Sequence, residues 1–229
     1  MQAVIYLIFN EGYAASAGQS LIRNDLCAEA IRLGRVLCEL LPHEPKNLGL
    51  LALMVLQDSR REARVNEEGE LVTLEQQDRS RWDAREIAEG VSLVQTALRL
   101  RRVGSYQLQA AIAAVHAEAE TADETDWRQI VALYEVLIRI TSSPIVALNH
   151  AAAVAMAEGF ERGLDLIDGA GANGTLQNYY LFHASRADLL RRLNHFDEAT
   201  AAYETALSLT TNRVEQDYIR RRLEEIHNY

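Results

Sequence analysis

The chain has 229 residues and a formal net charge of −10, because its 33 acidic residues outnumber its 23 Lys and Arg residues. Gripping a phosphate backbone needs a basic face, so this composition argues against direct nucleic-acid binding and favours protein partners. There are only 3 Pro and few aromatic residues, and Ala and Leu are abundant. That profile is typical of an all-α protein.

Charged residues interrupt every apolar run, so no stretch reaches the ~18 continuous apolar residues that a membrane span needs. The apolar start also lacks the basic residues that open a secretory signal. Cys27 and Cys38 lie about three helical turns apart, which is too far for a disulfide bond. We therefore expect a cytoplasmic protein with reduced thiols and no membrane contact.

The sequence begins within an apolar helical run, Met1–Phe9, that has no capping residue before it. Because domain edges are usually polar, this start is typical of a helix whose preceding residues are missing. We expect that part of the native protein, and part of its function, precedes Met1.

Further along the chain, apolar residues from Leu26 to Leu41 repeat at helical spacing up to Pro42 and predict one helix. Residues 48–56 are apolar nearly all round, which predicts a central helix buried on several sides. A turn sequence and a short alternating run then predict an irregular loop or small hairpin at about residues 65–82. Asp83 and Glu86 form a capping-box pattern that predicts the start of the next helix.

The last third of the chain contains a repeated phrase. Residues 194–209 resemble the second helix of a tetratricopeptide repeat, with Ala199, Tyr203 and Ala206 at the spacing that lets two helices pack closely. Phe160 and Gly163 repeat Phe196 and Ala199 at an offset close to the ~34-residue period of this repeat.

We therefore predict an all-α, tetratricopeptide-like helical solenoid of stacked antiparallel helix pairs. Its pairs are expected at about residues 106–143, 144–179 and 180–213, followed by a capping helix at 214–227. The chain then divides into an N-terminal helical region, 1–105, and a repeat region, 106–229.

Three phrases are not explained by helix stacking: YLIFNEGY at 6–13, the apolar run 50–54 leading to Arg60 and Arg61, and QDRSRWD at 77–83. Together they resemble the long C-terminal extension of extracytoplasmic-function sigma factors, bacterial relatives of sigma-70. The chain departs from that family at Gln57, where His is expected, and at Glu62, where Pro is expected. The family's promoter-binding and polymerase-binding regions are absent from this sequence.

The resemblance implies a role in regulating transcription initiation by RNA polymerase. The implied partners are proteins: the sigma regions of the same chain, RNA polymerase or a regulator. DNA contact is implied only through the absent N-terminal regions. Two other functions stay open, a free-standing tetratricopeptide adaptor and a small-molecule sensor with a pocket near Glu11 and Asp78.

Polar residues at irregular backbone are the candidate binding residues. The first group is expected where a helix breaks at Gly12, and the others lie in charged loops. One interpretation is that Glu11 or Asp78 pairs with Arg60 or Arg61 and fixes the loop; the other is a pocket for a peptide or small ligand. The candidates are Asn10, Glu11, Tyr13, Arg60, Arg61, Asp78, Arg79, Arg81 and Trp82.

Catalytic, metal and cofactor motifs give no support for an enzyme. The six histidines show no H-E-x-x-H pattern, and no nucleophile motif is present. Residues 169–174 match G-x-G-x-x-G, but they follow a predicted repeat helix, whereas dinucleotide binding needs the motif between a strand and a helix. We expect no catalysis, no metal and no cofactor.

Overall fold

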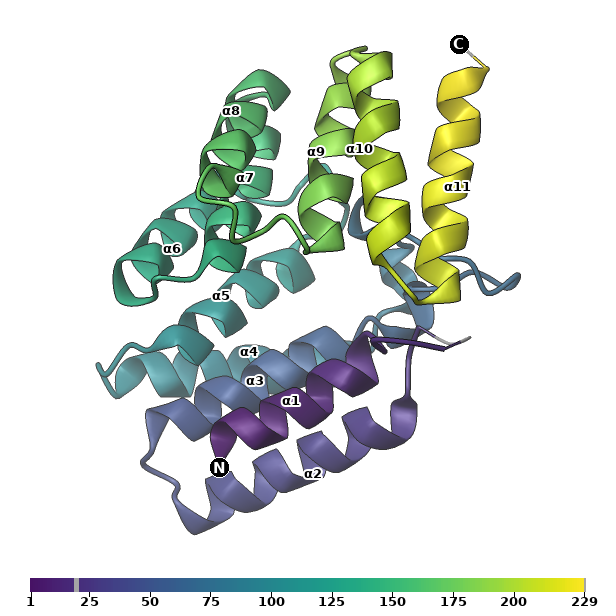
Figure 1. Ribbon diagram of the computed structural model, residues 1–229. Coiled ribbons are helices and arrows are strands. Elements are labelled where there is room, and N and C mark those ends of the chain that lie inside the picture. The colour runs from purple at the N-terminus through teal and green to yellow at the C-terminus, as the bar shows by residue number, and fades with distance from the viewer. Residues whose placement is uncertain (19–20, 229) are drawn as a thin grey trace. The chain divides into compact units, whose positions relative to one another are not determined.

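The computed structural model describes residues 1–18 and 21–228, and within them it shows eleven α-helices and three short 3-10 helices (Figure 1). The described part of the chain has no β-sheet, and Val65 and Leu71 form an isolated antiparallel bridge. The all-α prediction is therefore confirmed. The helices form two compact units, Met1–Asp126 (unit 1) and Trp127–Tyr229 (unit 2).

Unit 1 contains five α-helices and, between the third and fourth of them, three 3-10 helices. The α-helices are α1 (Gln2–Tyr13), α2 (Asn24–Leu40), α3 (Pro45–Asp58), α4 (Ala84–Arg99) and α5 (Ser105–Glu118). The 3-10 helices are η1 (Arg61–Ala63), η2 (Leu74–Gln76) and η3 (Arg79–Arg81).

Helix α3 is the centre of unit 1, because α1, α2, α4 and α5 all pack against it. Of its 14 residues only Lys46 and Gln57 are not buried, which confirms the predicted central helix. Each fully buried Leu contributes roughly 1.5–3 kcal/mol to folding. Pro45 occupies the first turn, where its missing N–H is not needed, and the Glu44 side chain caps the start by accepting from the Lys46 N–H.

The predicted helix break at Gly12 is wrong, because α1 continues through Gly12 to Tyr13. Gly12 is buried against α2, and a Cβ atom there would lie 2.7 Å from the backbone nitrogen of Cys27. The missing side chain thus serves close packing of α1 on α2 and does not end the helix. By contrast, α2 ends at Leu40, just before Pro42, as the sequence predicts.

The segment between α3 and α4, residues 59–83, is the expected irregular insertion. Its turn closes through a hydrogen bond from the Asn66 N–H to the Glu70 carbonyl at 3.0 Å. The Asp83 carboxylate then caps α4 by accepting from the backbone N–H groups of Arg85 and Glu86 at 2.8 and 3.1 Å. The Glu86 side chain does not complete a capping box here, because its carboxylate binds Arg61.

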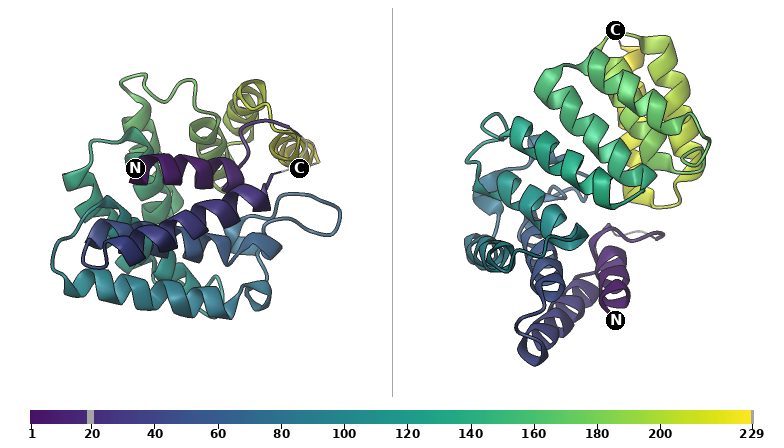
Figure 2. Two further views of the ribbon diagram at one scale, coloured as in Figure 1. Left: turned by 90° about the horizontal axis from the view of Figure 1, so that it is seen from below. Right: turned by 90° about the vertical axis from the view of Figure 1, so that its left-hand side faces the viewer.

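Unit 2 is a row of helices that lie side by side (Figure 2, right). Helices α7 and α8 form one pair and α9 and α10 form the next, and α11 packs on α10. This arrangement is that of a helical solenoid. The helices are α6 (Trp127–Ile140), α7 (Pro144–Glu158), α8 (Phe160–Gly171), α9 (Tyr180–Arg192), α10 (Phe196–Leu209) and α11 (Arg213–His227).

The two helices expected to form the first pair, within 106–143, fall in different units. Helix α5 belongs to unit 1, where it packs on α3 and α4, and α6 belongs to unit 2, where it packs on α7. The physical reason is that α5 buries residues on several sides, including Gln107, Leu108 and Ile112, and so acts as an inner helix of unit 1. The division expected from the motifs lies at residue 105, whereas the two compact units separate after Asp126.

The repeat phrase packs closely against the neighbouring helix in unit 2. Ala199, Tyr203 and Ala206 of α10 are each at most 1% exposed, and they pack with Ala187 of α9. In the preceding pair Gly163 takes the position of Ala199, and a Cβ atom there would lie only 2.3 Å from the Ala155 Cβ atom. Helices α7 and α8 therefore approach too closely for even one methyl group.

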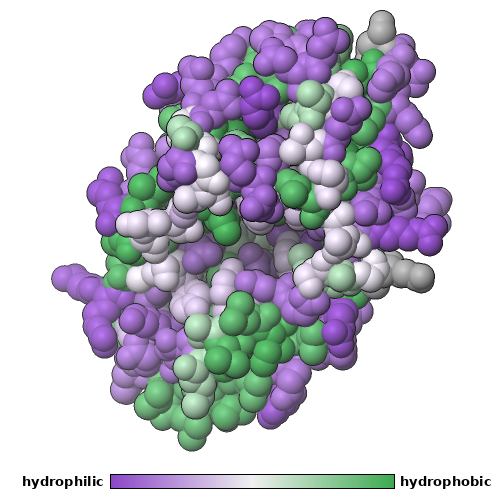
Figure 3. Space-filling view, in the orientation of Figure 1, coloured by the Kyte–Doolittle hydropathy of each residue, from purple (hydrophilic) through white to green (hydrophobic). Residues whose placement is uncertain are grey.

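The surface of unit 1 includes a strip of apolar side chains on α1. Met1, Val4 and Leu7 are 87%, 59% and 66% exposed, and apolar atoms gather over part of unit 1 in the space-filling view (Figure 3). Exposed apolar strips of this kind are typical of interaction surfaces. None of the helices in residues 1–18 and 21–228 combines the length and the apolar character that crossing a membrane requires.

We predict that Gly163→Ala lowers the free energy of unfolding by about 1–3 kcal/mol, because the new methyl group overpacks the α7–α8 contact. Gly169→Ala is a matched control in the same helix, since a Cβ atom there meets nothing within 4 Å. That change should leave stability unchanged or raise it by up to ~1 kcal/mol. Urea unfolding followed by circular dichroism measures both, and equal effects would contradict the proposed close approach.

Candidate functional site: an arginine–aromatic stack

Five side chains of unit 1 alternate between guanidinium groups and aromatic rings. The Arg64 Cζ atom lies 3.6 Å from the centroid of the Tyr13 ring. The Arg60 Cζ atom lies 5.9 Å from the Tyr13 centroid and 5.7 Å from the Trp82 centroid, and the Arg79 Cζ atom lies 5.0 Å from the Trp82 centroid. Each such cation–π contact contributes about 0.5–2 kcal/mol. We call these five residues the arginine–aromatic stack.

The insertion after α3 brings these side chains to the end of α1. Tyr13 is the last residue of α1, and Arg60 and Arg64 flank η1 on its two sides. Arg79 begins η3 and Trp82 follows it. The Asp83 N–H donates to the Ser59 carbonyl at 2.8 Å, so the two ends of the insertion lie together. That closure places Arg60 and Trp82 next to each other.

Two arginines of the stack hold the C-terminal end of α1. The Arg60 Nη2 atom donates to the Tyr13 hydroxyl oxygen, and the Arg64 Nη1 atom donates to the Tyr13 carbonyl oxygen. Carbonyls in the last turn of a helix have no partner within the helix, and cations are favourable there. The insertion thus satisfies and clamps the end of α1.

Arg79 caps the C-terminal end of α5 by donating to its carbonyl oxygens. Its Nη1 atom donates to the carbonyl oxygens of His116 and Ala119 at 2.6 and 2.7 Å, and its Nη2 atom donates to the Thr125 hydroxyl at 2.9 Å. Hydrogen bonds from a charged donor are about twice as strong as neutral ones. Through Arg60 and Arg79, the stack joins the ends of α1 and α5 to the insertion.

The stack makes its surroundings electropositive. Burial, together with the nearby charges of Arg60 and Arg79, lowers the pKa of His116 to about 4, so this imidazole is neutral at pH 7. Burial also lowers the pKa of Arg79, again with a contribution from Arg60, and Glu124 acts in the opposite direction. Cationic groups therefore dominate the field around Trp82.

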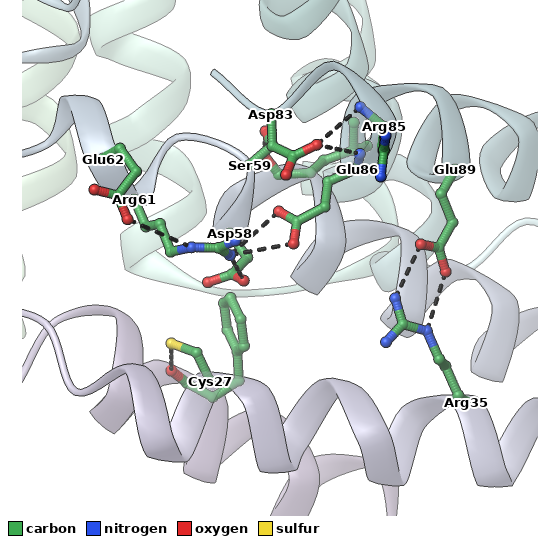
Figure 4. A network of polar contacts seen from close by, with 12 residues as sticks. Cys27, Arg35, Asp58, Ser59, Arg61, Glu62, Asp83, Arg85, Glu86 and Glu89 are labelled. Atoms are coloured by element: carbon green, nitrogen blue, oxygen red, sulfur yellow. Dashed lines mark hydrogen bonds and ion pairs between the residues drawn. The ribbon is translucent and has the colours of Figure 1, made fainter. Parts of the chain in front are cut away.

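A second polar cluster lies where α3, η1 and α4 meet (Figure 4). The Arg61 Nη1 atom donates to a carboxylate oxygen of Asp58 and to a carboxylate oxygen of Glu86, the latter at 3.1 Å. Burial raises the pKa of both Asp58 and Glu86, although the Arg61 charge opposes that rise. One guanidinium group thus pairs with the buried carboxylate of Asp58 and the half-buried carboxylate of Glu86, and its role is to join three elements.

The expected pairing of Glu11 or Asp78 with Arg60 or Arg61 is not the arrangement in the structure. Arg61 pairs with Asp58, which precedes it by one turn, and with Glu86. The Glu11 carboxylate accepts from the Ser16 N–H at 3.3 Å. The Asp78 carboxylate caps η3 by accepting from the N–H and hydroxyl of Ser80 at 2.9 and 2.7 Å. Each carboxylate takes a partner that is close to it in sequence.

The structure thus brings together four of the nine candidate binding residues: Tyr13, Arg60, Arg79 and Trp82. Asn10 is on α1, where its side chain hydrogen-bonds Tyr6, and Arg81 is exposed on η3. Sequence reasoning missed Arg64, whose position in the same arginine run was the available signal. It also missed the half-buried His116, which no motif marks.

A hollow of about 550 Å³ on unit 2 is the other candidate, and it lies among α8, α9 and α10. Arg186 in its lining pairs with Asp168 at 2.7 Å and with Glu198 at 3.8 Å. Because Arg186 already has two carboxylate partners, the hollow gives weaker evidence for a ligand than the stack does. In the part of the chain that the structure describes, no three His, Cys, Asp or Glu side chains are grouped as metal ligands.

We predict that Arg79→Gln lowers the free energy of unfolding by about 2–4 kcal/mol, because the carbonyl oxygens of His116 and Ala119 lose a charged donor. Arg81→Gln is the matched control, since Arg81 is exposed on the same short helix. That change should alter stability by less than about 0.5 kcal/mol. Thermal and urea unfolding provide the comparison, and a small loss in Arg79→Gln would contradict the capping role.

We also predict that His116 makes the fold sensitive to mild acid. Its folded pKa of about 4 lies below the usual 6.5, so between these values the unfolded chain binds a proton that the folded chain does not. Stability therefore falls as the pH falls through this window, by about 2 kcal/mol between pH 7 and pH 5. Asp58 and Glu86, with raised pKa values, act in the opposite direction.

The measurement is the free energy of unfolding at pH 7 and pH 5 in the wild type, His116→Gln and the exposed control His43→Gln. The acid-induced loss should shrink by about 2 kcal/mol in His116→Gln alone. An unchanged pH dependence in that variant would show that His116 is not held neutral.

The comparisons with known proteins cover the stack and most of the chain. Residues 1–98, which include all five residues of the stack, match the model of a family of unknown function, DUF6596. The chain is also similar to the uncharacterized protein R00370 of Rhizobium meliloti (strain 1021), with 45% identity over 223 residues. That match covers 97% of this chain and 52% of the relative, so the chain spans about half the length of the relative.

Proposed function

We propose that this chain is the regulatory protein-interaction segment of an alternative sigma factor of the extracytoplasmic-function type, acting in transcription initiation. The observation that carries the proposal is the set of three phrases that resemble the extension of that group. In the fold, the phrases converge: Tyr13 comes from the first, Arg60 from the second, and Arg79 and Trp82 from the third. A common site gives the three phrases one physical reason to occur together.

Two features of unit 2 support a binding role over catalysis. Stacked helix pairs present side chains at fixed spacing along an extended surface, which suits recognition of a peptide or another domain. The repeat residues Ala199, Tyr203 and Ala206 are all used for packing, so the exposed polar positions are the ones available to a partner. The proposed partners are the sigma regions of the same protein, RNA polymerase or a regulator.

The charge of the chain suggests how such a contact works. With a net charge of −10, the segment is attracted to the basic surfaces that promoter and polymerase binding require. About half of the Rhizobium meliloti relative lies outside the match, which leaves room for such regions in a longer protein. A covalent tether raises the effective concentration, so a weak electrostatic contact is sufficient. DNA binding, on this proposal, belongs only to those other regions.

The test uses the native protein that contains this segment. An immunoblot of source cells should first show a band well above 25.7 kDa. A protease site is then inserted immediately before Met1 in that longer protein. After cleavage, the segment should stay bound to the remainder at low salt and dissociate at high salt, because exposed charge contacts are screened. Run-off transcription with core RNA polymerase should change several-fold on dissociation.

The control is the same protein with a protease site that cannot be cleaved. A native band at 25.7 kDa would contradict the proposal and favour a free-standing adaptor. Unchanged transcription together with no association of the two cleaved parts would also contradict it.

A further inference from the structure

The arginine–aromatic stack holds more hydrogen-bond donors than acceptors. A guanidinium group has five N–H donors, and the side chain of Arg60 uses one of them, toward the Tyr13 hydroxyl. The indole N–H of Trp82 is buried without an acceptor among the described residues, and the residue is only 6% exposed. The Nε–H of Arg79 is buried without an acceptor as well. These donors would be satisfied by a group that carries several hydrogen-bond acceptors.

The charges at the stack lead to the same conclusion. Within the described residues neither Arg60 nor Arg79 forms an ion pair with a carboxylate, although the chain as a whole is acidic and Glu124 lies near enough to raise the pKa of Arg79. The neighbouring Arg61, by contrast, pairs with both Asp58 and Glu86. Burial and the repulsion between Arg60 and Arg79 lower the pKa of Arg79, and an anion bound directly beside them would relieve that repulsion.

The geometry favours an oxyanion among the possible anions. The Arg60 guanidinium lies between the Tyr13 and Trp82 rings and donates one N–H to the Tyr13 hydroxyl, so its other N–H groups are available to a ligand. The planar fork of a guanidinium group matches the two oxygens of a carboxylate or phosphate. The indole N–H of Trp82 and the hydroxyl of Tyr13 are further donors for the same oxygens.

We infer that unit 1 contains an oxyanion-binding site formed by Arg60, Trp82, Tyr13 and Arg79, which takes the carboxylate or phosphate group of a small ligand. The site goes beyond the proposed function, and either one holds without the other. Tyr13 belongs to α1, whereas Arg60, Arg79 and Trp82 belong to the insertion, and Arg79 also caps α5. A bound oxyanion therefore ties α1, the insertion and α5 together. The ligand therefore stabilises unit 1 in proportion to its occupancy.

The experiment uses the full 229-residue chain with Trp127→Phe, which leaves Trp82 as the single tryptophan. Inorganic phosphate and succinate are titrated separately at constant ionic strength, with sodium chloride replacing the probe. We expect a saturable change in Trp82 fluorescence and a melting temperature that rises with probe concentration. Saturation with phosphate alone identifies a phosphate site, saturation with succinate alone a carboxylate site, and saturation with both a general oxyanion site.

Three variants show whether the response comes from the stack. Arg60→Gln removes the fork and should weaken binding at least ~10-fold, the effect expected for losing a charged hydrogen bond. Trp82→Phe keeps a ring but removes the N–H donor, and it should weaken the melting-temperature response even if Arg60→Gln fails to fold. Arg81→Gln, in the exposed neighbour, should bind like the parent.

Two results would overturn the inference. One is the absence of a saturable response to both probes. The other is an equal response in the parent, Arg60→Gln and Trp82→Phe, which would show that the oxyanion acts elsewhere on the chain.

Discussion

The burial of α3 on all its sides, with only Lys46 and Gln57 outside the core, is the constraint on which unit 1 depends. Its apolar residues need partners on every side, and α1, α2, α4 and α5 provide them. The same burial reaches the last residue of the helix, Asp58, whose carboxylate is then both desolvated and placed at the negative end of the helix dipole. A cation must follow within a turn, and Arg61 is that cation.

The site follows from this requirement. Arg61 is committed to Asp58 and to Glu86 of α4, and this fixes the path of the chain as it leaves α3. Arg60 and Arg64, on the two sides of η1, then reach the end of α1 at Tyr13. The insertion returns through η3 and places Trp82 beside Arg60. A structural ion pair and a cationic aromatic site therefore result from one short run of arginines.

The sequence was sufficient for the features that depend on periodicity. The central burial of residues 48–56 and the close packing of Ala199, Tyr203 and Ala206 could be predicted, because apolar spacing reports local structure directly. The partners of Arg61 could not be predicted, because an acidic chain offers many carboxylates and tertiary folding decides among them. Gly12 was misread for a similar reason: a glycine marks either a break or a close contact, and only the position of Cys27 distinguishes the two.

Helix α5 shows how a local pattern misleads when two units share one chain. Its small residues fit a repeat helix, yet Gln107 on the same helix is 1% exposed and packs against Gly49 of α3. A helix with a buried glutamine and apolar residues on several sides is an inner helix, whatever follows it in sequence. Its C-terminal carbonyls then need a donor from within unit 1, and Arg79 provides it. The assignment of α5 to unit 1 and the presence of an arginine beside Trp82 thus have one cause, the capping of an inner helix.

Helix capping accounts for the Nη atoms of Arg79, but it leaves the Nε–H of Arg79 and the indole N–H of Trp82 without acceptors. Helix capping alone is therefore an incomplete explanation of the stack, and the donors that it leaves unused are the physical argument for a ligand.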